Sequence, residues 1–163
     1  MIEASTLDGS RVVLPKDEIA PLRDSLRGNL LLSGDDGYDG ARRVWNGNVD
    51  RRPALIMRCL DAADVQKSVI FARQRGLLLS VRGGGHSAPG YGTNDGGLVI
   101  DLSMMKSVTV DVSRSTARAD GGVLWREFDG QTQAHGLATT GGTVSNTGIA
   151  GLTLGGGLGW LHA

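Results

Sequence analysis

The sequence predicts an α+β fold in a single domain, with a small β-α-β core followed by a more antiparallel part. Three observations support this class: a strand-helix-strand pattern over residues 54–81, alternating apolar and polar residues over 107–120, and an uneven placement of the 26 glycines. Most of the glycines follow residue 82. The first half is therefore typical of an α/β scaffold, and in the second half the backbone must approach something closely.

The N-terminal region is expected to contain one helix. Residues 16–27 carry apolar side chains at helical spacing, and Gly28 ends the run. The stretch that follows, "LLLSGDDGYDG", predicts a short strand and then a turn-rich break. We therefore interpret residues 1–44 as an N-terminal leader that contains a helix.

The β-α-β unit spans residues 54–81. Asp61 is a good N-cap for its helix, apolar side chains that include Val69 and Ala72 lie on one predicted face, and Gly76 ends the helix. Such units join parallel strands by right-handed crossovers. The glycine-rich loop that follows leaves the carboxyl end of the second strand, where open α/β sheets bind their ligands.

The rest of the chain is less regular. Residues 97–103 predict a third strand, and residues 107–120 predict an antiparallel hairpin that turns near Ser113. Residues 123–136 have near-helical apolar spacing and end in glycine. The last stretch, 137–163, matches neither a helix nor a strand by pattern. The second part of the fold is therefore expected to be a hairpin, a helix and glycine-rich loops.

Bulk composition excludes several partners. The 17 Lys and Arg residues balance the 17 Asp and Glu residues, so net charge favours neither a nucleic acid nor a membrane. The N-terminus lacks the basic and apolar runs of a signal peptide, and no apolar stretch approaches membrane-spanning length. A single cysteine, Cys59, excludes an intrachain disulfide. These features predict a cytoplasmic protein in which Cys59 is a small buried hydrophobic residue.

The glycine-rich loops do not match the familiar phosphate motifs. The chain has no Gly-Lys-Ser/Thr, and G-x-G-x-x-G fails at Ala88, Asp95 and Trp160. Loops 83–92 and 141–159 remain, with a short Asp-Gly-Gly between them. They could be tight connections, or their amides could bind an anion. Because such loops recur after successive strands, we favour a large, anionic, partly flat ligand.

His86 is the most versatile side chain in these loops, in the stretch "SVRGGGHSAPGYG". A lone histidine is more often structural than catalytic. His135 and His162 lie in unrelated contexts, so no metal site is expected, and a Ser-His-Asp triad lacks its G-x-S-x-G elbow. Chemistry alone leaves the role of His86 open.

Three motifs, in order along the chain, carry a resemblance. They are "SVRGGGHSAPGYGTNDGGLVIDLSMM", "ADGGVLWREFD" and "GLATTGGTVSNTGIAGLTLGGGLGWL". Together they resemble the N-terminal flavin-binding region of the FAD-linked oxidases, the vanillyl-alcohol oxidase / p-cresol methylhydroxylase (PCMH) superfamily, and especially its berberine-bridge-enzyme-like branch. The resemblance begins near Trp45. It implies a PCMH-type FAD-binding domain over residues 45–163.

The resemblance implies FAD as the cofactor, with the loop of residues 82–87 around its pyrophosphate. It also implies a covalent bond between His86 and the 8α-methyl carbon of the flavin. Val144 stands where some members carry a second, cysteine tether, so at most one tether is implied. The residues implied to bind FAD are Arg82, Gly83, Gly84, Gly85, His86, Ser87, Gly90, Ile100, Asp101, Leu102, Ser103, Gly121, Gly141, Gly142, Thr143, Val144, Gly148, Ile149, Gly151, Gly155, Gly156 and Gly157.

The implied activity is that of an FAD-dependent oxidoreductase, which oxidises an alcohol, sugar or amine-like carbon of a small molecule by hydride transfer to the flavin. Family members continue well beyond the last glycine motif, and their catalytic base and substrate pocket lie in that later part. We therefore expect a domain that is truncated at its C-terminal side and holds no catalytic residue. Two alternatives stay open: a non-catalytic module that binds FAD or another nucleotide, and a truncated chain that needs a partner segment or self-association.

Overall fold

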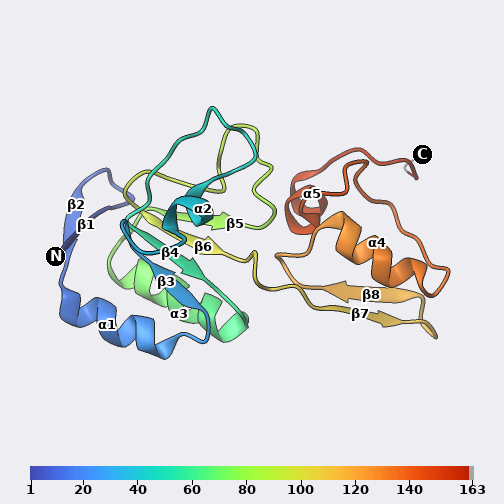
Figure 1. The fold of residues 1–163 in the computed structure, drawn as a ribbon, viewed down its shortest axis with the longest axis horizontal. Helices are drawn as coiled ribbons and strands as arrows, with labels where there is room; N and C mark the ends of the chain where they lie inside the picture. The colour runs from blue at the N-terminus through green and yellow to red at the C-terminus, as the bar shows by residue number, and fades with distance from the viewer. Residues whose placement is uncertain (162–163) are drawn as a thin grey trace.

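A four-stranded sheet forms the centre of the first half of the computed structural model, which describes residues 1–161 (Figure 1). The strand order is β3-β4-β6-β5. β4 (Leu55–Arg58), β6 (Leu98–Asp101) and β5 (Leu79–Arg82) are parallel, and β3 (Asn29–Leu31) is an antiparallel edge strand. The predicted parallel orientation of β4 and β5 is confirmed. The two strands do not pair with each other, because β6 lies between them.

Helix α3 (Ala62–Gln74) joins β4 to β5. As predicted, Asp61 is its N-cap, and the side chain accepts a hydrogen bond from the backbone N–H of Asp64 at 2.9 Å. The predicted apolar face is wrong at Val69, whose side chain is 42% exposed. The buried side of α3 instead carries Asp64, Ser68 and Ala72.

The buried carboxylate of Asp64 explains this orientation of α3. It accepts hydrogen bonds from the backbone N–H groups of Arg27 and Gly28 at 2.9 Å and of Leu60 at 3.1 Å. Ser68 donates to the carbonyl of Asp64 at 2.7 Å. One buried carboxylate that accepts three backbone hydrogen bonds outweighs the preference of one valine for the interior.

The N-terminal residues pack on the same core as the sheet. β1 (Ile2–Ser5) and β2 (Arg11–Leu14) form an antiparallel hairpin, and helices α1 (Lys16–Ser25) and α2 (Tyr38–Arg42) follow. Helix α1 was predicted, whereas the hairpin and α2 were not. The core that β1, β2 and α1 share with the sheet contains Ala4, Leu14, Ile19, Leu30, Leu55, Met57, Cys59, Ala72, Leu77, Leu98 and Ile100. Helix α2 packs instead on a second cluster, in which Tyr38 and Ala41 contact Ile56 and Val99 of the sheet.

The second half is smaller and contains the predicted hairpin and helix. β7 (Val108–Asp111) pairs antiparallel with β8 (Thr116–Ala119), and helix α4 (Trp125–Gln133) packs on β7. A fourth element, α5 (Ile149–Gly155), falls in the stretch predicted to be neither helix nor strand. Ile149 and Leu152 of α5 pack on a separate buried cluster, Val123, Trp125 and Phe128.

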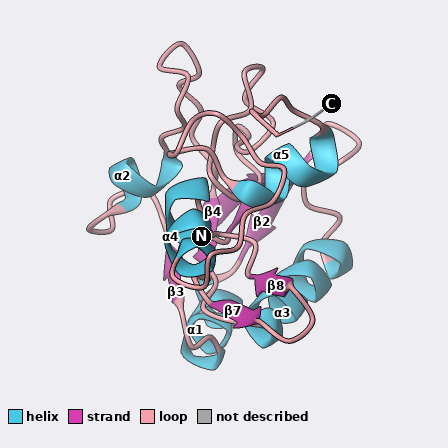
Figure 2. Ribbon diagram, turned by 90° about the vertical axis from the view of Figure 1, so that its right-hand side faces the viewer, coloured by secondary structure: helices cyan, strands magenta, loops and turns pink. Residues whose placement is uncertain are grey.

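The irregular loops of both halves gather at one end of the molecule, above the sheets (Figure 2). The loop after β5 extends from the first half toward α5 in the second (Figure 1). The division of the chain at residue 45 stays a prediction. In the structure, residues on both sides of that position share one hydrophobic core.

Candidate functional site

Three glycine motifs that are far apart in sequence meet at the junction of the two halves. A Cβ added to Gly84 would lie 2.4 Å from the backbone nitrogen of Gly148, and one added to Gly148 would lie 2.4 Å from that of Gly84. A Cβ on Gly83 would lie 2.9 Å from the carbonyl oxygen of Gly121. Only glycine permits these backbones to approach so closely. The structure therefore brings together the motifs that the sequence singled out.

A cavity of about 660 Å³ opens beside this junction, between loop 81–92 and residues 147–156. A Cβ added to Gly151 or Gly155 would have no protein atom within 4 Å, so any side chain there would extend into open space. The volume falls in the range of sites for small molecules and cofactors. The predicted FAD-binding residues that line it are Arg82, Gly83, Gly84, Gly85, His86, Ser87, Leu102, Gly148, Gly151, Gly155 and Gly156.

The other predicted residues support the cavity or lie away from it. Ile100 is fully buried in the sheet, and Gly90 packs against Val49. Gly141 and Gly142 lie against the indole of Trp125. The predicted residues that do not line the cavity are Gly90, Ile100, Asp101, Ser103, Gly121, Gly141, Gly142, Thr143, Val144, Ile149 and Gly157.

The loop after β5 presents backbone donors to the cavity. Gly85 has φ +72°, which is a conformation that favours glycine and turns the chain before His86. Within residues 1–161, the N–H groups of Gly84, Gly85, His86 and Ser87 donate to no protein acceptor. Successive unpaired amides of this kind form an anion-binding concavity.

A buried carboxylate with two arginines lies below this loop. Asp101 is 0% exposed and accepts hydrogen bonds from the backbone N–H and the hydroxyl of Ser103, each at 3.0 Å. The Nε atom of Arg58 lies 3.4 Å from one carboxylate oxygen, and that of Arg82 lies 3.9 Å from the other. Of these three side chains only Arg82 lines the cavity, and its guanidinium also donates to the carbonyl of Ala41. Arg82 therefore contributes a positive charge to the cavity wall, which favours an anionic ligand.

His86 is half-buried and lines the cavity, and its ring stacks on the indole of Trp45. The ring centroids are 5.3 Å apart and the planes differ by 19°. The backbone N–H of Trp45 also donates to the carbonyl of Gly85 at 3.0 Å. Sequence reasoning used Trp45 only as the start of the resemblance. A tryptophan in a polar, irregular stretch was the one available signal for this contact.

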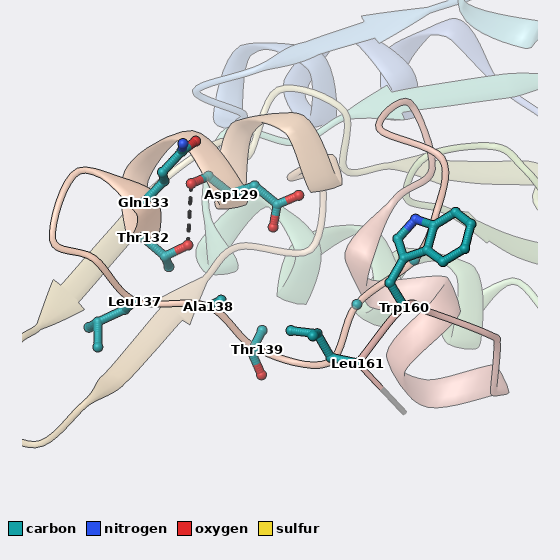
Figure 3. A pocket seen from close by; sticks show the side chains of 10 residues that line it. Asp129, Thr132, Gln133, Leu137, Ala138, Thr139, Trp160 and Leu161 are labelled. Carbon is teal, nitrogen blue, oxygen red and sulfur yellow. Dashed lines mark hydrogen bonds between the residues drawn. The ribbon is translucent and has the colours of Figure 1, made fainter. Parts of the chain in front are cut away.

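A second, smaller cavity of about 390 Å³ lies between α4 and the end of the described chain (Figure 3). Gly141 and Gly142 line it, together with Asp129, Trp160 and Leu161. Burial raises the pKa of the Asp129 carboxyl above its usual range. His86 does not line this second cavity, and neither do the residues with unpaired amides, Gly84, Gly85 and Ser87, that line the first cavity.

Neither a metal centre nor a membrane-spanning helix occurs in the part of the chain that the structure describes. Residues 1–161 contain no group of three His, Cys, Asp or Glu side chains that could hold a metal ion. Among the same residues, no helix is long and apolar enough to cross a bilayer. His162, which we weighed as a ligand, lies outside the described residues.

The site fits a dinucleotide cofactor. Unpaired amides beside the positive charge of Arg82 suit a pyrophosphate, and walls of glycine backbone leave room for a flat ring to lie close. The fold and the site therefore define the class: an α+β domain with a cavity between two glycine-rich loops that suits an anionic, partly flat cofactor. The chain belongs to the family described as "FAD binding domain", which matches residues 53–163.

Similar proteins narrow the family to the FAD-linked oxidoreductases. The chain is 44% identical to (R)-6-hydroxynicotine oxidase of Paenarthrobacter nicotinovorans, over 84% of this chain and 30% of that protein. It is 37% identical to the FAD-linked oxidoreductase pgmH of Aspergillus terreus, over 94% of this chain and 32% of that protein. The chain thus spans about three tenths of the length of these curated relatives.

Solved structures share the fold. The crystal structure of 6-hydroxy-D-nicotine oxidase from Arthrobacter nicotinovorans superimposes with a TM-score of 0.82 at 44% identity, covering 84% of this chain and 30% of that one. The berberine-bridge-enzyme-like protein 1 of Physcomitrella patens gives 0.78 at 28% identity, covering 87% and 31%. The predicted resemblance and the PCMH-type FAD-binding fold are confirmed.

Proposed function

We propose that this chain binds FAD in the cavity between loop 81–92 and residues 147–156, as the flavin-binding part of an oxidoreductase. The observation that supports this best is the run of unpaired amides from Gly84 to Ser87, which lines the same cavity as Arg82. Bound FAD supplies the chemistry, since it accepts a hydride from a substrate carbon. The chain supplies the binding, the orientation and the exclusion of water.

Each wall of the cavity has a part in this proposal. The amides of Gly84–Ser87 would donate to the pyrophosphate, and Arg82 would contribute positive charge from below. Leu102, Leu152 and Leu154 provide apolar surface for the ring system. The backbone at Gly151 and Gly155 leaves room for a flat group to lie close.

We further propose that His86 forms the covalent link to the flavin. Its imidazole lines the cavity and, when neutral, carries a nucleophilic nitrogen. Forming the link would replace a C–H bond of the flavin 8α-methyl group and the N–H bond of the imidazole by one C–N bond. Two protons and two electrons would leave, with molecular oxygen as the proposed electron acceptor.

The proposed substrate is a small molecule oxidised at an alcohol, sugar or amine-like carbon. The relative named (R)-6-hydroxynicotine oxidase, at 44% identity, supports the amine-like choice. No residue of the cavity is proposed as the catalytic base. Substrate turnover would need a base and a substrate pocket from a further segment or a second subunit.

Flavin analysis of the purified protein tests these proposals. We expect FAD, seen as visible flavin absorbance and identified by mass after release from His86→Ala. Wild-type protein should keep its flavin after denaturation, whereas His86→Ala should release it. The exposed His135 and the buried Cys59 supply controls: His135→Ala and Cys59→Ala should behave as wild type.

Three results would contradict the proposals separately. Release of FMN or a nicotinamide nucleotide would refute the FAD assignment, and a flavin peptide that maps outside His86 would refute the tether. Tightly bound FAD without turnover on any alcohol, sugar or amine, in a protein that also contains the further segment or second subunit, would instead favour the alternative of a non-catalytic FAD-binding module.

A further inference from the structure

An irregular segment, residues 44–51, holds the loop that carries His86. The segment has no helix or strand, yet it makes hydrogen bonds along the length of residues 85–93. The side chain of Val49 also packs against Gly90, where an added Cβ would lie 2.6 Å from it. The hydrogen bonds run from Trp45 N to Gly85 O (3.0 Å), from Asn46 Nδ2 to Ala88 O (2.8 Å), and from Arg51 Nη1 to Gly90 O (2.9 Å) and Thr93 O (2.8 Å).

The segment is itself anchored before any cofactor binds. The guanidinium of Arg42, only 9% exposed, pairs with Asp39 at 2.7 Å and with Asp50, and it donates to the carbonyl of Arg51 at 3.2 Å. The backbone N–H of Arg52 donates to the carboxylate of Asp95 at 2.8 Å. Residues 44–51 are thus a fixed support rather than a free loop.

Trp45 is the one aromatic residue of this support, and most of its surface lies outside any hydrophobic core. Its side chain is 69% exposed, and it does not line the cavity. The imidazole of His86 does line the cavity and stacks on the indole. The indole therefore contacts the imidazole without itself lining the cavity.

The stack leaves the reactive part of the imidazole free. Both ring nitrogens direct their lone pair or N–H in the plane of the ring, so contact through the ring face uses neither of them. Within the described residues, neither nitrogen of His86 takes part in a hydrogen bond. Among the described residues, the imidazole of His86 is therefore restrained by its stacking on Trp45 and not by a hydrogen bond.

We propose that Trp45 is a positioning residue that fixes the orientation of the His86 imidazole toward the cavity, so that the ring is ready for attachment to the flavin. Attachment of His86 to the flavin rests on the proposed function, whereas the orientation of the His86 ring can be tested independently of it. Restricting the two side-chain torsions of His86 in advance removes an ordering cost from the attachment step.

NMR of the cofactor-free protein tests the orientation without flavin. The chain has 3 histidines, so the imidazole ring protons give few signals, and His86→Gln identifies those of His86. Protons held over an indole face are shielded, so we expect upfield-shifted His86 ring signals. Trp45→Ala should return them to ordinary positions, and Trp45→Phe should keep part of the shift.

The time course of covalent flavin formation after addition of FAD gives the second readout. We expect Trp45→Ala to slow it by about 3- to 10-fold, the effect of one aromatic contact on a conformational equilibrium. Trp45→Phe should restore most of the rate. The matched control is Trp160→Leu, since Trp160 is 86% exposed and lines the other cavity. Unfolding midpoints should stay close to wild type in all three variants.

The two readouts separate the failure of this inference from that of the proposed function. Unshifted His86 signals in wild type, or an unchanged attachment rate in Trp45→Ala, would overturn the positioning role. Shifted signals that depend on Trp45, in a protein that never forms the flavin bond, would support the ring orientation and refute the tether.

Discussion

The contact between the two glycine loops makes a strong prediction for Gly84→Ala. The new Cβ would lie 2.4 Å from the nitrogen and 2.5 Å from the Cα of Gly148, whereas ordinary contact begins at 3.4 Å. The obstacle is backbone, which cannot rotate away, so the loops must separate by about 1 Å. Overpacking of this kind costs about 1–3 kcal/mol. Against a total stability of roughly 5–15 kcal/mol, the loss is measurable without abolishing the fold.

Separated loops should also bind FAD more weakly. Moving the amides by 1 Å would lose at least one charge-assisted hydrogen bond to the pyrophosphate, worth about 1.5–3 kcal/mol, so the Kd should rise at least about tenfold. Urea unfolding and flavin titration measure the two effects. Gly130→Ala is the matched control: a Cβ on this helical glycine meets nothing within 4 Å, and the change should stabilise α4 by up to about 1 kcal/mol. Wild-type stability and FAD affinity in Gly84→Ala would refute the argument.

Three further predictions concern the scaffold. Asp64→Ala removes the buried carboxylate that accepts hydrogen bonds from three backbone N–H groups and should lower the free energy of unfolding in urea by on the order of 3 kcal/mol; a loss below 1 kcal/mol would contradict the role of this carboxylate. Burial raises the pKa of the Cys59 thiol to about 11, so iodoacetamide at pH 8 should label it at the rate of unfolding, and rapid labelling of the native protein would be inconsistent with this. The N–H of Asp64, and then Arg27, lower the pKa of Asp61, so the stability that Asp61 contributes is present above its unfolded pKa and lost as pH falls through its folded pKa. The difference in unfolding midpoint between wild type and Asp61→Ala should therefore shrink from pH 7 toward acid, and a constant difference would show that charge is not involved.

Local sequence signals predicted those helices and strands whose caps, turns and apolar patterns lie within a few residues of one another. The N-cap of α3, the alternation in β7 and β8, and the apolar runs of β4, β5 and β6 each appear within a few residues of sequence. The β1–β2 hairpin also has a local signal that the prediction of a leader with one helix did not use, since Asp8-Gly9 is a favoured hairpin turn and Gly9 has φ +84°.

Other features depend on distant partners and could not be predicted from local pattern. Helix α5 contains Gly151 and Gly155, which disfavour a helix by about 1 kcal/mol each, and it forms because Ile149 and Leu152 pack on the Trp125 cluster. The placement of β6 between β4 and β5 is likewise determined by packing between distant segments. The same is true of helix α3, which buries Asp64 and leaves Val69 exposed.

The candidate site also has features that the sequence could predict and features that it could not. Sequence motifs identified the loop at residues 82–87 and the last glycine run, and the structure places both on the cavity. They could not separate the lining residues from neighbours such as Ile100, which lies in the same motif but is buried in the sheet. Nor could they reveal the stack of Trp45 on His86, because the two residues meet only after the chain has folded.

The meeting of Gly84 with Gly148 also sets an order of events during synthesis. A ribosome adds residues from the N-terminus, so the central sheet and its helices can form while residue 148 is still unmade. The His86 loop then exists with one wall of its cavity missing, since residues 147–156 supply the other. A nascent chain that ends before α5 can therefore be well folded around its first core while the cavity is only half built. Under the proposed function, FAD would bind only after residues 147–156 have been made and have folded against the loop that carries His86.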